Sequence, residues 1–191
     1  MPYKFLFKID GENHFEANLH THQCESVKEG HRCGRNVIIG YTYCFQHLMM
    51  KKKLRIKQST LGDYQGLFCQ DKLRPTDNNI LFRAGDIITE YIGERLNRDE
   101  LYQRYSDKTG PYAALLNDKG DTIDAALMRG VGALSNHGNT AKERNAMLEV
   151  RGQNVYLKAT KNIRNGSEIL CNYGTIYEMN EEGVFFMTKK R

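Results

Sequence analysis

The sequence predicts a mainly β protein of the α+β class, preceded by a small N-terminal unit of different composition. Three observations support this. From residue 54 onward the chain divides into short apolar segments of four to eleven residues, bounded by Gly, Asn or Asp. Only one segment in that part carries clear helix signals. Upstream of residue 54, three cysteines and a histidine fall within 24 residues.

The N-terminal unit is predicted to bind zinc. Cys24, Cys33, Cys44 and His47 are spaced C-x8-C-x10-C-x2-H, and thiolates with imidazole are the usual ligands of closed tetrahedral zinc sites. A segment this short and polar cannot bury a useful core, so metal binding has to stabilise it. The alternative is a set of unconnected thiols. Three other histidines could substitute as ligands but are better explained as surface residues: His20, His22 and His31.

The segment "LMMKKKLRIKQS" after His47 is expected to be a helix that passes into a strand and links the zinc unit to the main domain. It is basic, and residues 1–57 hold 10 Lys and Arg against 5 Asp and Glu, whereas residues 58–191 hold 18 of each. This imbalance predicts an anionic partner for the N-terminal third, with nucleic acid the commonest. A solvated basic face without a partner explains the charge equally well.

The main domain is expected to be a succession of short strands. Arg151-Gly152-Gln153 should form a hairpin turn, and Asn165-Gly166 a second tight turn. Active-site residues in such a domain come from loops and strand ends. The strand candidates are "LRIKQS", "GLFCQ", "DIITEYIGERL", "YAALLN", "TIDAA", "MLEV", "NVYLKAT" and "EILCNY".

The helix is predicted over "NRDELYQRY". Asn97 is the expected N-cap, and Glu100 three residues later completes a capping box. Spacing assigns Tyr102 and Tyr105 to the side of the helix that faces the core.

The length and composition predict one well-packed domain with a small accessory unit, in a soluble intracellular protein. No run of eighteen apolar residues and no signal-peptide pattern occurs in the 191 residues, so no membrane partner is expected. Five cysteines, an odd number, favour metal or free thiols over disulfides. Cys69 and Cys171 are expected to be buried apolar residues rather than ligands.

Familiar catalytic motifs are absent. There is no G-x-S-x-G, P-loop or H-E-x-x-H, and His137 is the only histidine after residue 47, which argues against a Ser/His/Asp triad. Tyrosine is the abundant candidate instead. Five of the eleven stand at expected strand ends or turns, where they could converge on a pocket: Tyr64, Tyr91, Tyr112, Tyr173 and Tyr177. Tyr91 is expected to be structural.

The order of several strings along residues 54–178 resembles that of SET-domain protein lysine methyltransferases. The strings are "KQSTLGDYQGLF", "GDIITEYIGE", "GPYAALL", "IDAALMRGVGALSNHGN" and "IRNGSEILCNYG". The resemblance implies a SET fold of small sheets with a knot-like C-terminal threading. It also implies in-line transfer of a methyl group from S-adenosylmethionine to a deprotonated lysine in a tyrosine-lined channel. The Cys3His segment resembles short modules of viral and protist proteins, more weakly.

The resemblance also implies roles for particular residues. Tyr64, Gln65 and Gly66 match the loop around the methionine end of the cofactor. Asn136 and His137 match the Asn-His pair that binds the cofactor and braces the knot, and Asn145 matches a later asparagine of the same motif. Tyr173 matches the tyrosine whose hydroxyl points at the transferred methyl group, with Tyr112 lining the lysine channel. Phe185 and Phe186 are expected to close that channel, or alternatively to pack on the core.

The chain departs from the family pattern at several places. Tyr64 replaces the first glycine of a G-x-G, Ala133-Leu134 replaces Arg-Phe, and residues 138–144 form a longer loop. No cysteine cluster follows residue 174. These departures keep an alternative open, namely a catalytically weak or inactive SET-fold binding module in a chromatin or nucleic-acid complex. Methylation of a non-histone protein is a further option.

The expected organisation has three parts. Residues 1–53 form the zinc-binding segment and basic linker, residues 54–178 the SET domain, and residues 179–191 a tail that closes the lysine channel. The expected partner is a protein substrate, which the resemblance implies to be a histone, in the nucleus. Nucleic acid or a nucleosome could contact the basic N-terminal third.

Overall fold

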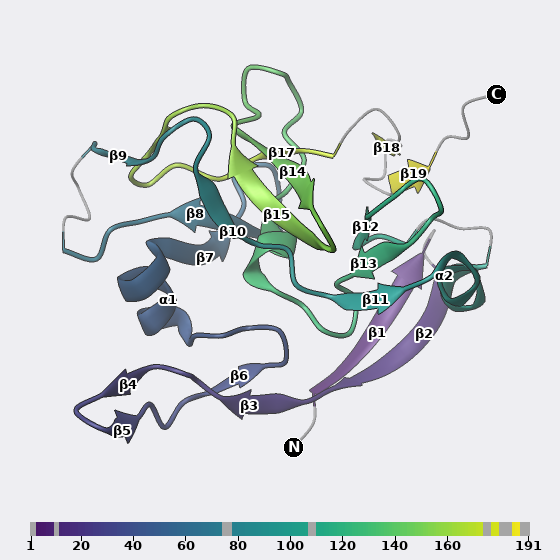
Figure 1. The fold of residues 1–191 in the computed structure, drawn as a ribbon, viewed down its shortest axis with the longest axis horizontal. Coiled ribbons are helices and arrows are strands. Elements are labelled where there is room, and N and C mark those ends of the chain that lie inside the picture. The colour runs from purple at the N-terminus through teal and green to yellow at the C-terminus, as the bar shows by residue number, and fades with distance from the viewer. Residues whose placement is uncertain are drawn as a thin grey trace.

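The computed structural model describes residues 3–9, 12–73, 78–106, 110–173, 177–179 and 185–187, with side chains for 20–73, 78–106 and 110–173 only. Most elements are short strands, as expected (Figure 1). The helices are α1 (Phe45–Lys52), α2 (Arg98–Tyr105) and the 3-10 turn η1 (Val131–Leu134). The strands are β1 (Tyr3–Ile9), β2 (Glu12–Leu19), β3 (Thr21–Gln23), β4 (Val27–Lys28), β5 (His31–Arg32), β6 (Asn36–Ile38), β7 (Leu54–Gln58), β8 (Gln65–Cys69), β9 (Ile80–Phe82), β10 (Ile87–Glu90), β11 (Glu94–Leu96), β12 (Ala113–Leu115), β13 (Thr122–Asp124), β14 (Ala146–Arg151), β15 (Asn154–Ala159), β16 (Ile163–Arg164), β17 (Cys171–Asn172), β18 (Tyr177–Met179) and β19 (Phe185–Met187).

The central sheet has the strand order β10-β15-β14-β17. Strand β15 alternates between buried and half-buried residues, so that Val155, Leu157 and Ala159 face the core. The predicted hairpin is confirmed, because β14 pairs with β15 up to Arg151 opposite Asn154, and Gly152 adopts a positive φ of 60° in the turn. The last strand, β17, is only two residues long, which is shorter than the predicted "EILCNY" segment.

A second sheet, in the order β11-β13-β12, carries α2. The predicted capping box is confirmed, because the Asn97 side chain accepts from the backbone amide of Glu100 and the Glu100 carboxylate accepts from the backbone amide of Asn97. Tyr105 is fully buried and donates to Asp124, as expected for a core residue. The expectation for Tyr102 is wrong, since 63% of this residue is exposed. Tyr102 lies one position beyond Leu101 on a two-turn helix, and this rotation of about 100° carries it into solvent.

The N-terminal region contains more strand than the sequence analysis predicted. A β1–β2 hairpin, with Tyr3 opposite Leu19, precedes the Cys3His segment. The signal was present in the alternating residues of "KFLFKI", followed by Asp10-Gly11, a frequent hairpin turn. The helix-to-strand transition after His47 is confirmed, because α1 ends at Lys52 and β7 begins at Leu54. Within the described part of the chain, no helix has the length and apolar character needed to cross a bilayer.

The main core lies where the central sheet, the β7–β8 pair and η1 meet. Its fully buried members include Leu54, Leu67, Leu157 and Ile169. Cys69 and Cys171 are also fully buried members of this core, as predicted. Tyr41 and Tyr43 of the N-terminal unit pack against the same core, so this unit is joined to the main domain by apolar contacts.

Candidate active site

Two segments flank strand β17 on opposite sides. The amide of Cys171 donates to the carbonyl of Asn136 at 2.8 Å, and His137 pairs with Cys171 in a parallel bridge. On the other side, β14 pairs with β17 in parallel, with Ala146 opposite Cys171. The loop 138–145 connects the two flanking segments. The segment that carries β17 therefore runs between them. This is the knot-like crossing that the fold class implies.

Asn145 fixes this crossing from within the loop. Its Nδ2 donates to the carbonyl of Glu168 at 2.8 Å, and its Oδ1 accepts from the amide of Leu170 at 3.0 Å. Its own amide donates to the carbonyl of Leu170 at 2.9 Å. The Asn145 side chain therefore satisfies two backbone groups on the threaded segment, which an aliphatic side chain could not do, and the Asn145 amide satisfies a third.

Glu168 ties the crossing to the loop that precedes β8. Its buried carboxylate accepts from Ser59 Oγ at 2.7 Å, from the amide of Thr60 at 2.7 Å and from Asn136 Nδ2 at 3.3 Å. The space beside it is open only because residue 66 is glycine, as a Cβ there would lie 2.3 Å from Glu168 Oε1. Glu168 was missed as a functional residue, although it is the acidic residue of the "SEILCNYG" string.

Replacing Glu168 with glutamine should destabilise the protein by about 2–4 kcal/mol. The substitution replaces one acceptor oxygen with an NH2 group, which then faces other donors. A hydrogen bond to a charged group contributes about 1.5–3 kcal/mol. Urea unfolding measures the change. The matched control is Glu143→Gln, because Glu143 is an exposed carboxylate that accepts from the amide of Thr140 in the neighbouring loop. An equal loss in both variants would contradict a special role for Glu168.

His137 holds the strand end that carries Tyr173. Its Nδ1 accepts from the amide of Tyr173 at 3.2 Å, so the ring proton belongs on Nε2. Burial, and then the positive charge of Arg144, lower the pKa of His137, and the neutral ring is the form that can accept this hydrogen bond. Among the described residues, His137 belongs to no group that could hold a metal. Its isolation in the sequence therefore agrees with a bracing function.

The lowered pKa of His137 makes stability depend on pH in a defined direction. Below about pH 6.5 the unfolded chain binds a proton at this histidine that the folded chain resists. Stability contributed by neutral His137 should therefore be complete above pH 6.5 and lost as the pH falls through the folded pKa. Urea midpoints at pH 5.5 and 7.5 measure this. The difference between them should shrink in His137→Gln and stay unchanged in His31→Gln, which alters an exposed histidine on β5.

Tyr91, Tyr112 and Tyr173 converge on a pocket of about 250 Å³. The phenol of Tyr91 donates to the carbonyl of Tyr112 at 2.8 Å, and that of Tyr173 donates to the carbonyl of Ser135 at 2.7 Å. Both phenols are thus held at defined positions. The rest of the wall is mainly apolar and consists of Pro111, Ala113, Ala114, Leu115, Ala133, Met147, Leu148, Val150 and Asn172. Such a pocket suits an aliphatic stem that carries a polar end.

The other residues expected at the site are placed as follows. Gln65 touches Asn136, because Asn136 Nδ2 donates to its carbonyl at 3.0 Å. Tyr64 is 49% exposed and does not line the tyrosine pocket; its ring covers Gly62. Burial and the carboxylate of Glu168 raise the pKa of Tyr64. The side chains of Phe185, Phe186 and Tyr177 lie outside those that the structure describes.

The Cys3His site is confirmed. The ligand atoms of Cys24, Cys33, Cys44 and His47 all lie within 4.8 Å of one another. His47 Nδ1 is 3.5 Å from Cys24 Sγ and 3.4 Å from Cys44 Sγ. Burial raises the pKa of the Cys24 thiol; at Cys44 burial acts in the same direction, but hydrogen bonds from the backbone of His47 and the side chain of Arg35 leave its pKa lowered.

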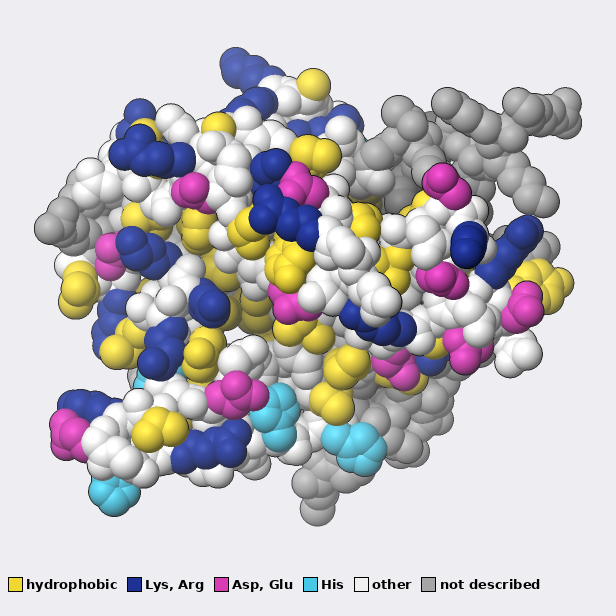
Figure 2. Space-filling view, in the orientation of Figure 1, with side chains coloured by type: hydrophobic (Ala, Val, Ile, Leu, Met, Phe, Trp, Pro, Cys, Tyr) yellow, Lys and Arg dark blue, Asp and Glu magenta, His cyan; other side chains and the backbone are white. Residues whose placement is uncertain are grey.

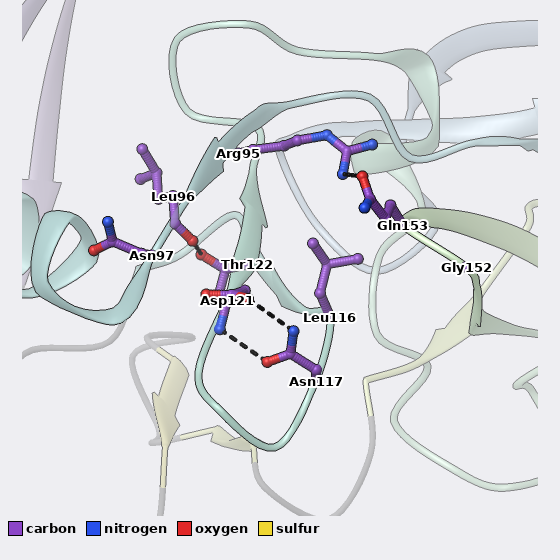
Figure 3. Close-up of a pocket in the computed structure, with 9 residues that line it drawn as sticks. All are labelled: Arg95, Leu96, Asn97, Leu116, Asn117, Asp121, Thr122, Gly152 and Gln153. Carbon is purple, nitrogen blue, oxygen red and sulfur yellow. Dashed lines mark hydrogen bonds between the residues drawn. The ribbon is translucent and has the colours of Figure 1, made fainter.

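A second pocket, of about 350 Å³, lies between β11, the turn before β13 and the tip of the β14–β15 hairpin (Figure 3). Its polar groups are already paired. Arg95 donates to Gln153 at 3.1 Å, and Asn117 donates to Asp121 at 2.8 Å. These contacts connect the hairpin to the second sheet and strengthen the turn, and they leave no convergent set of catalytic groups. The tyrosine pocket is the better candidate.

Comparison with known proteins agrees with this geometry. The family model for the SET domain matches residues 79–174. The chain belongs to the SET-domain family.

Solved structures with a similar fold include the methyltransferase domain of human PR domain-containing protein 2, with a TM-score of 0.50, 19% identity, and coverage of 72% of this chain and 87% of that one. A structure of ctPRC2 in complex with H3K27me3 and H3K27M has a TM-score of 0.55 and 23% identity, over 75% of this chain and 17% of that one. An active polycomb repressive complex 2 in the basal state has a TM-score of 0.51 and 27% identity, over 65% of this chain and 16% of that one. No curated protein sequence matches the chain.

Proposed function

We propose that this protein is an S-adenosylmethionine-dependent protein lysine N-methyltransferase. The observation that carries the proposal is the position of Tyr173. Its backbone amide is bound by His137, its phenol is bound by the carbonyl of Ser135, and its ring lines the tyrosine pocket. Tyr173 thus joins the Asn-His turn to a pocket that suits a lysine stem. Membership of the SET-domain family and its methyltransferase neighbours support the reaction class.

The proposed cofactor site consists of Tyr64, Gln65, Gly66, Asn136, His137 and Tyr173. These residues fit S-adenosylmethionine, because they provide an exposed aromatic ring together with backbone and amide groups for its polar end. Asn136 uses Nδ2 to bind Gln65, while its Oδ1 accepts no hydrogen bond from another described residue. When bound, the cofactor supplies an electron-poor methyl group on sulfur.

The tyrosine pocket prepares the lysine for attack on that methyl group. Its apolar wall excludes water from the lysine stem and disfavours the charged ammonium, which promotes the deprotonated amine. Tyr112 lines the stem. Tyr173 donates a hydrogen bond to the carbonyl of Ser135, which holds its phenol at a fixed position in the wall of the pocket. We propose Phe185 and Phe186, within residues 179–191, as the wall that closes the channel.

Histone is the proposed substrate, and the nucleus the proposed location. A protein of similar fold, ctPRC2, has been solved in complex with H3K27me3 and H3K27M. The test is incubation with labelled S-adenosylmethionine and core histones, with cofactor binding followed by calorimetry. Incorporation of label at lysine would support the proposal. Failure to bind the cofactor and to label any protein would refute it.

Zinc is the proposed occupant of the Cys3His site. Zinc–sulfur and zinc–nitrogen distances of about 2.3 and 2.1 Å give tetrahedral ligand-to-ligand edges of about 3.5 Å. The observed separations of His47 Nδ1 from Cys24 and Cys44, 3.5 and 3.4 Å, fit such a site. We propose residues 1–53 as the zinc-binding segment and linker, and 54–178 as the SET domain, since β7 and β8 share the main core.

A basic surface favours the second candidate function, a binding module for nucleic acid. Lys and Arg side chains gather over α1, β8 and β9 (Figure 2). An open hollow of about 450 Å³ there is lined by Lys53, Arg83 and Arg164, and Asp71 is the one acidic residue among the described residues that line it. The three basic residues are exposed and come from separate segments, so the surface exceeds the N-terminal third that the sequence indicated.

Nucleic-acid binding can be tested separately from methyl transfer. Each lost phosphate contact reduces the slope of log affinity against log salt by about 0.9. Replacing Lys53, Arg83 and Arg164 with alanine should therefore reduce the slope for duplex DNA by about 2–3. A triple variant with the same charge change outside the hollow, at Lys119, Lys142 and Lys161, serves as the control. Equal slopes in the two variants would exclude this surface as the contact.

A further inference from the structure

The zinc unit touches the main domain at Arg129, a residue between β13 and η1. The amide of Arg129 donates to the carbonyl of Ile39 at 3.2 Å. Gly40 packs directly on the Arg129 backbone, where a Cβ on residue 40 would lie 2.5 Å from the Arg129 carbonyl carbon. Gly40 also has a φ of 96°, which favours glycine. The close approach therefore depends on the absence of a side chain at residue 40.

The side chain of Arg129 extends from this contact to the tyrosine pocket. Its guanidinium carbon lies 3.8 Å from the centre of the Tyr112 ring, which is a close cation–π contact. Its Nε donates to the carbonyl of Ala125 at 3.1 Å and so fixes the guanidinium plane. Tyr112 in turn lines the tyrosine pocket and accepts from Tyr91 through its carbonyl.

Tyr41 makes a second connection beside the first. It packs against both the apolar cluster around Cys24 and Cys44 and the main core. Burial raises the pKa of Tyr41 to about 12, while the positive charge of Arg129 acts in the opposite direction. Tyr41 therefore packs on both the N-terminal unit and the main core.

We propose that Arg129 is a positioning residue that transmits the placement of the zinc unit to the substrate channel. Residues 39 and 40 set the Arg129 backbone, and its guanidinium sets the Tyr112 ring against which the lysine stem packs. The zinc unit thereby controls binding of the substrate peptide, whereas the cofactor loop at Tyr64–Gly66 is held separately through Glu168. The reference to a lysine stem rests on the proposed methyltransferase function.

Two glycines of the zinc unit provide a matched test. Gly30 and Gly40 both have a positive φ, but a Cβ at Gly30 would meet nothing within 4 Å. Gly40→Ala should raise KM for a histone peptide about tenfold, within the usual range of coupling between sites, and leave KM for S-adenosylmethionine unchanged. Gly30→Ala introduces the same backbone strain without the clash and should leave both KM values unchanged. Equal effects of the two variants would show that strain alone acts and would overturn the proposal.

A second pair of variants addresses Arg129 itself. Arg129→Met removes the cation over Tyr112, and Lys51→Met removes the cation that lies over Tyr43 at 5.9 Å, away from the channel. We expect a raised peptide KM with little change in kcat in the first variant only, with partial rescue by Arg129→Lys. A peptide KM unaffected in Arg129→Met, or a fall in kcat alone, would contradict positioning through Tyr112.

A readout without substrate separates this proposal from the proposed function. With 3-fluorotyrosine incorporated, the resonance of Tyr112, assigned with Tyr112→Phe, should shift on removal of zinc by a chelator and in Gly40→Ala, and stay in place in Gly30→Ala. If neither zinc removal nor Gly40→Ala shifts the Tyr112 resonance, the coupling is refuted even if methyl transfer is found. A shift in a protein that transfers no methyl group would retain the coupling and reject only the proposed reaction.

Discussion

Tyr173→Phe should lower kcat for methyl transfer roughly 100-fold, the loss typical of removing one preorganised polar group at a reaction centre. The phenol oxygen is held by donation to the carbonyl of Ser135 at 2.7 Å, and the amide of the same residue is held by His137. Phenylalanine keeps the ring and the backbone hydrogen bond but removes the oxygen. Cofactor binding should therefore persist, and steady-state kinetics with saturating peptide isolate the effect on kcat.

The stability of Tyr173→Phe must be measured beside its activity. The lost hydrogen bond contributes about 1 kcal/mol, so the variant should remain folded at 25 °C. Tyr156→Phe is the control, because the phenol of Tyr156 on β15 accepts a hydrogen bond from Asn154 Nδ2 and does not line the tyrosine pocket. Wild-type kcat in Tyr173→Phe would remove Tyr173 from the reaction and favour a different catalytic group.

The Cys3His site and the α2 helix could be predicted because their signals are local. Ligands at x2 spacing share one turn, and a capping box lies within four residues. The hairpin β14–β15 was predictable for the same reason. In contrast, Tyr102 and Tyr105 are equally apolar in the sequence, and only the docking of α2 on Asp124 decides that Tyr105 is buried and Tyr102 exposed.

The long-range parts of the site could be reached only through the family resemblance. It grouped Gln65, Asn136 and Tyr173, which are far apart in the chain, and the structure brings them into one connected set of contacts. Glu168 and Arg129 were missed because their partners are determined by tertiary structure. Glu168 accepts from Ser59, 109 residues earlier, and Arg129 contacts both the Tyr112 ring and the backbone of the N-terminal unit at Ile39. Single-residue signals do not encode such contacts.

Cys44→Ser should abolish stoichiometric zinc binding and unfold the N-terminal unit. Structural zinc in small units contributes about 10–16 kcal/mol of apparent binding free energy, which here substitutes for an adequate core. Among the residues whose side chains are described, the buried members of the apolar cluster of this unit are Cys24, Val37 and Cys44, and two of these three are proposed zinc ligands. Cys44 is thus both a proposed ligand and a member of the buried cluster. Metal content by mass spectrometry and thermal unfolding by circular dichroism measure the loss.

Two histidine variants distinguish loss of a zinc ligand from nonspecific destabilisation of the N-terminal unit. His47→Ala removes a ligand and should release zinc, whereas His31→Ala alters an exposed histidine that lies outside the four-residue group and should retain it. Because Tyr41 and Tyr43 pack against the main core, loss of zinc should also loosen that face. Peptide KM should then rise in Cys44→Ser and His47→Ala together. Full zinc retention in His47→Ala would mean that another group serves as the fourth ligand.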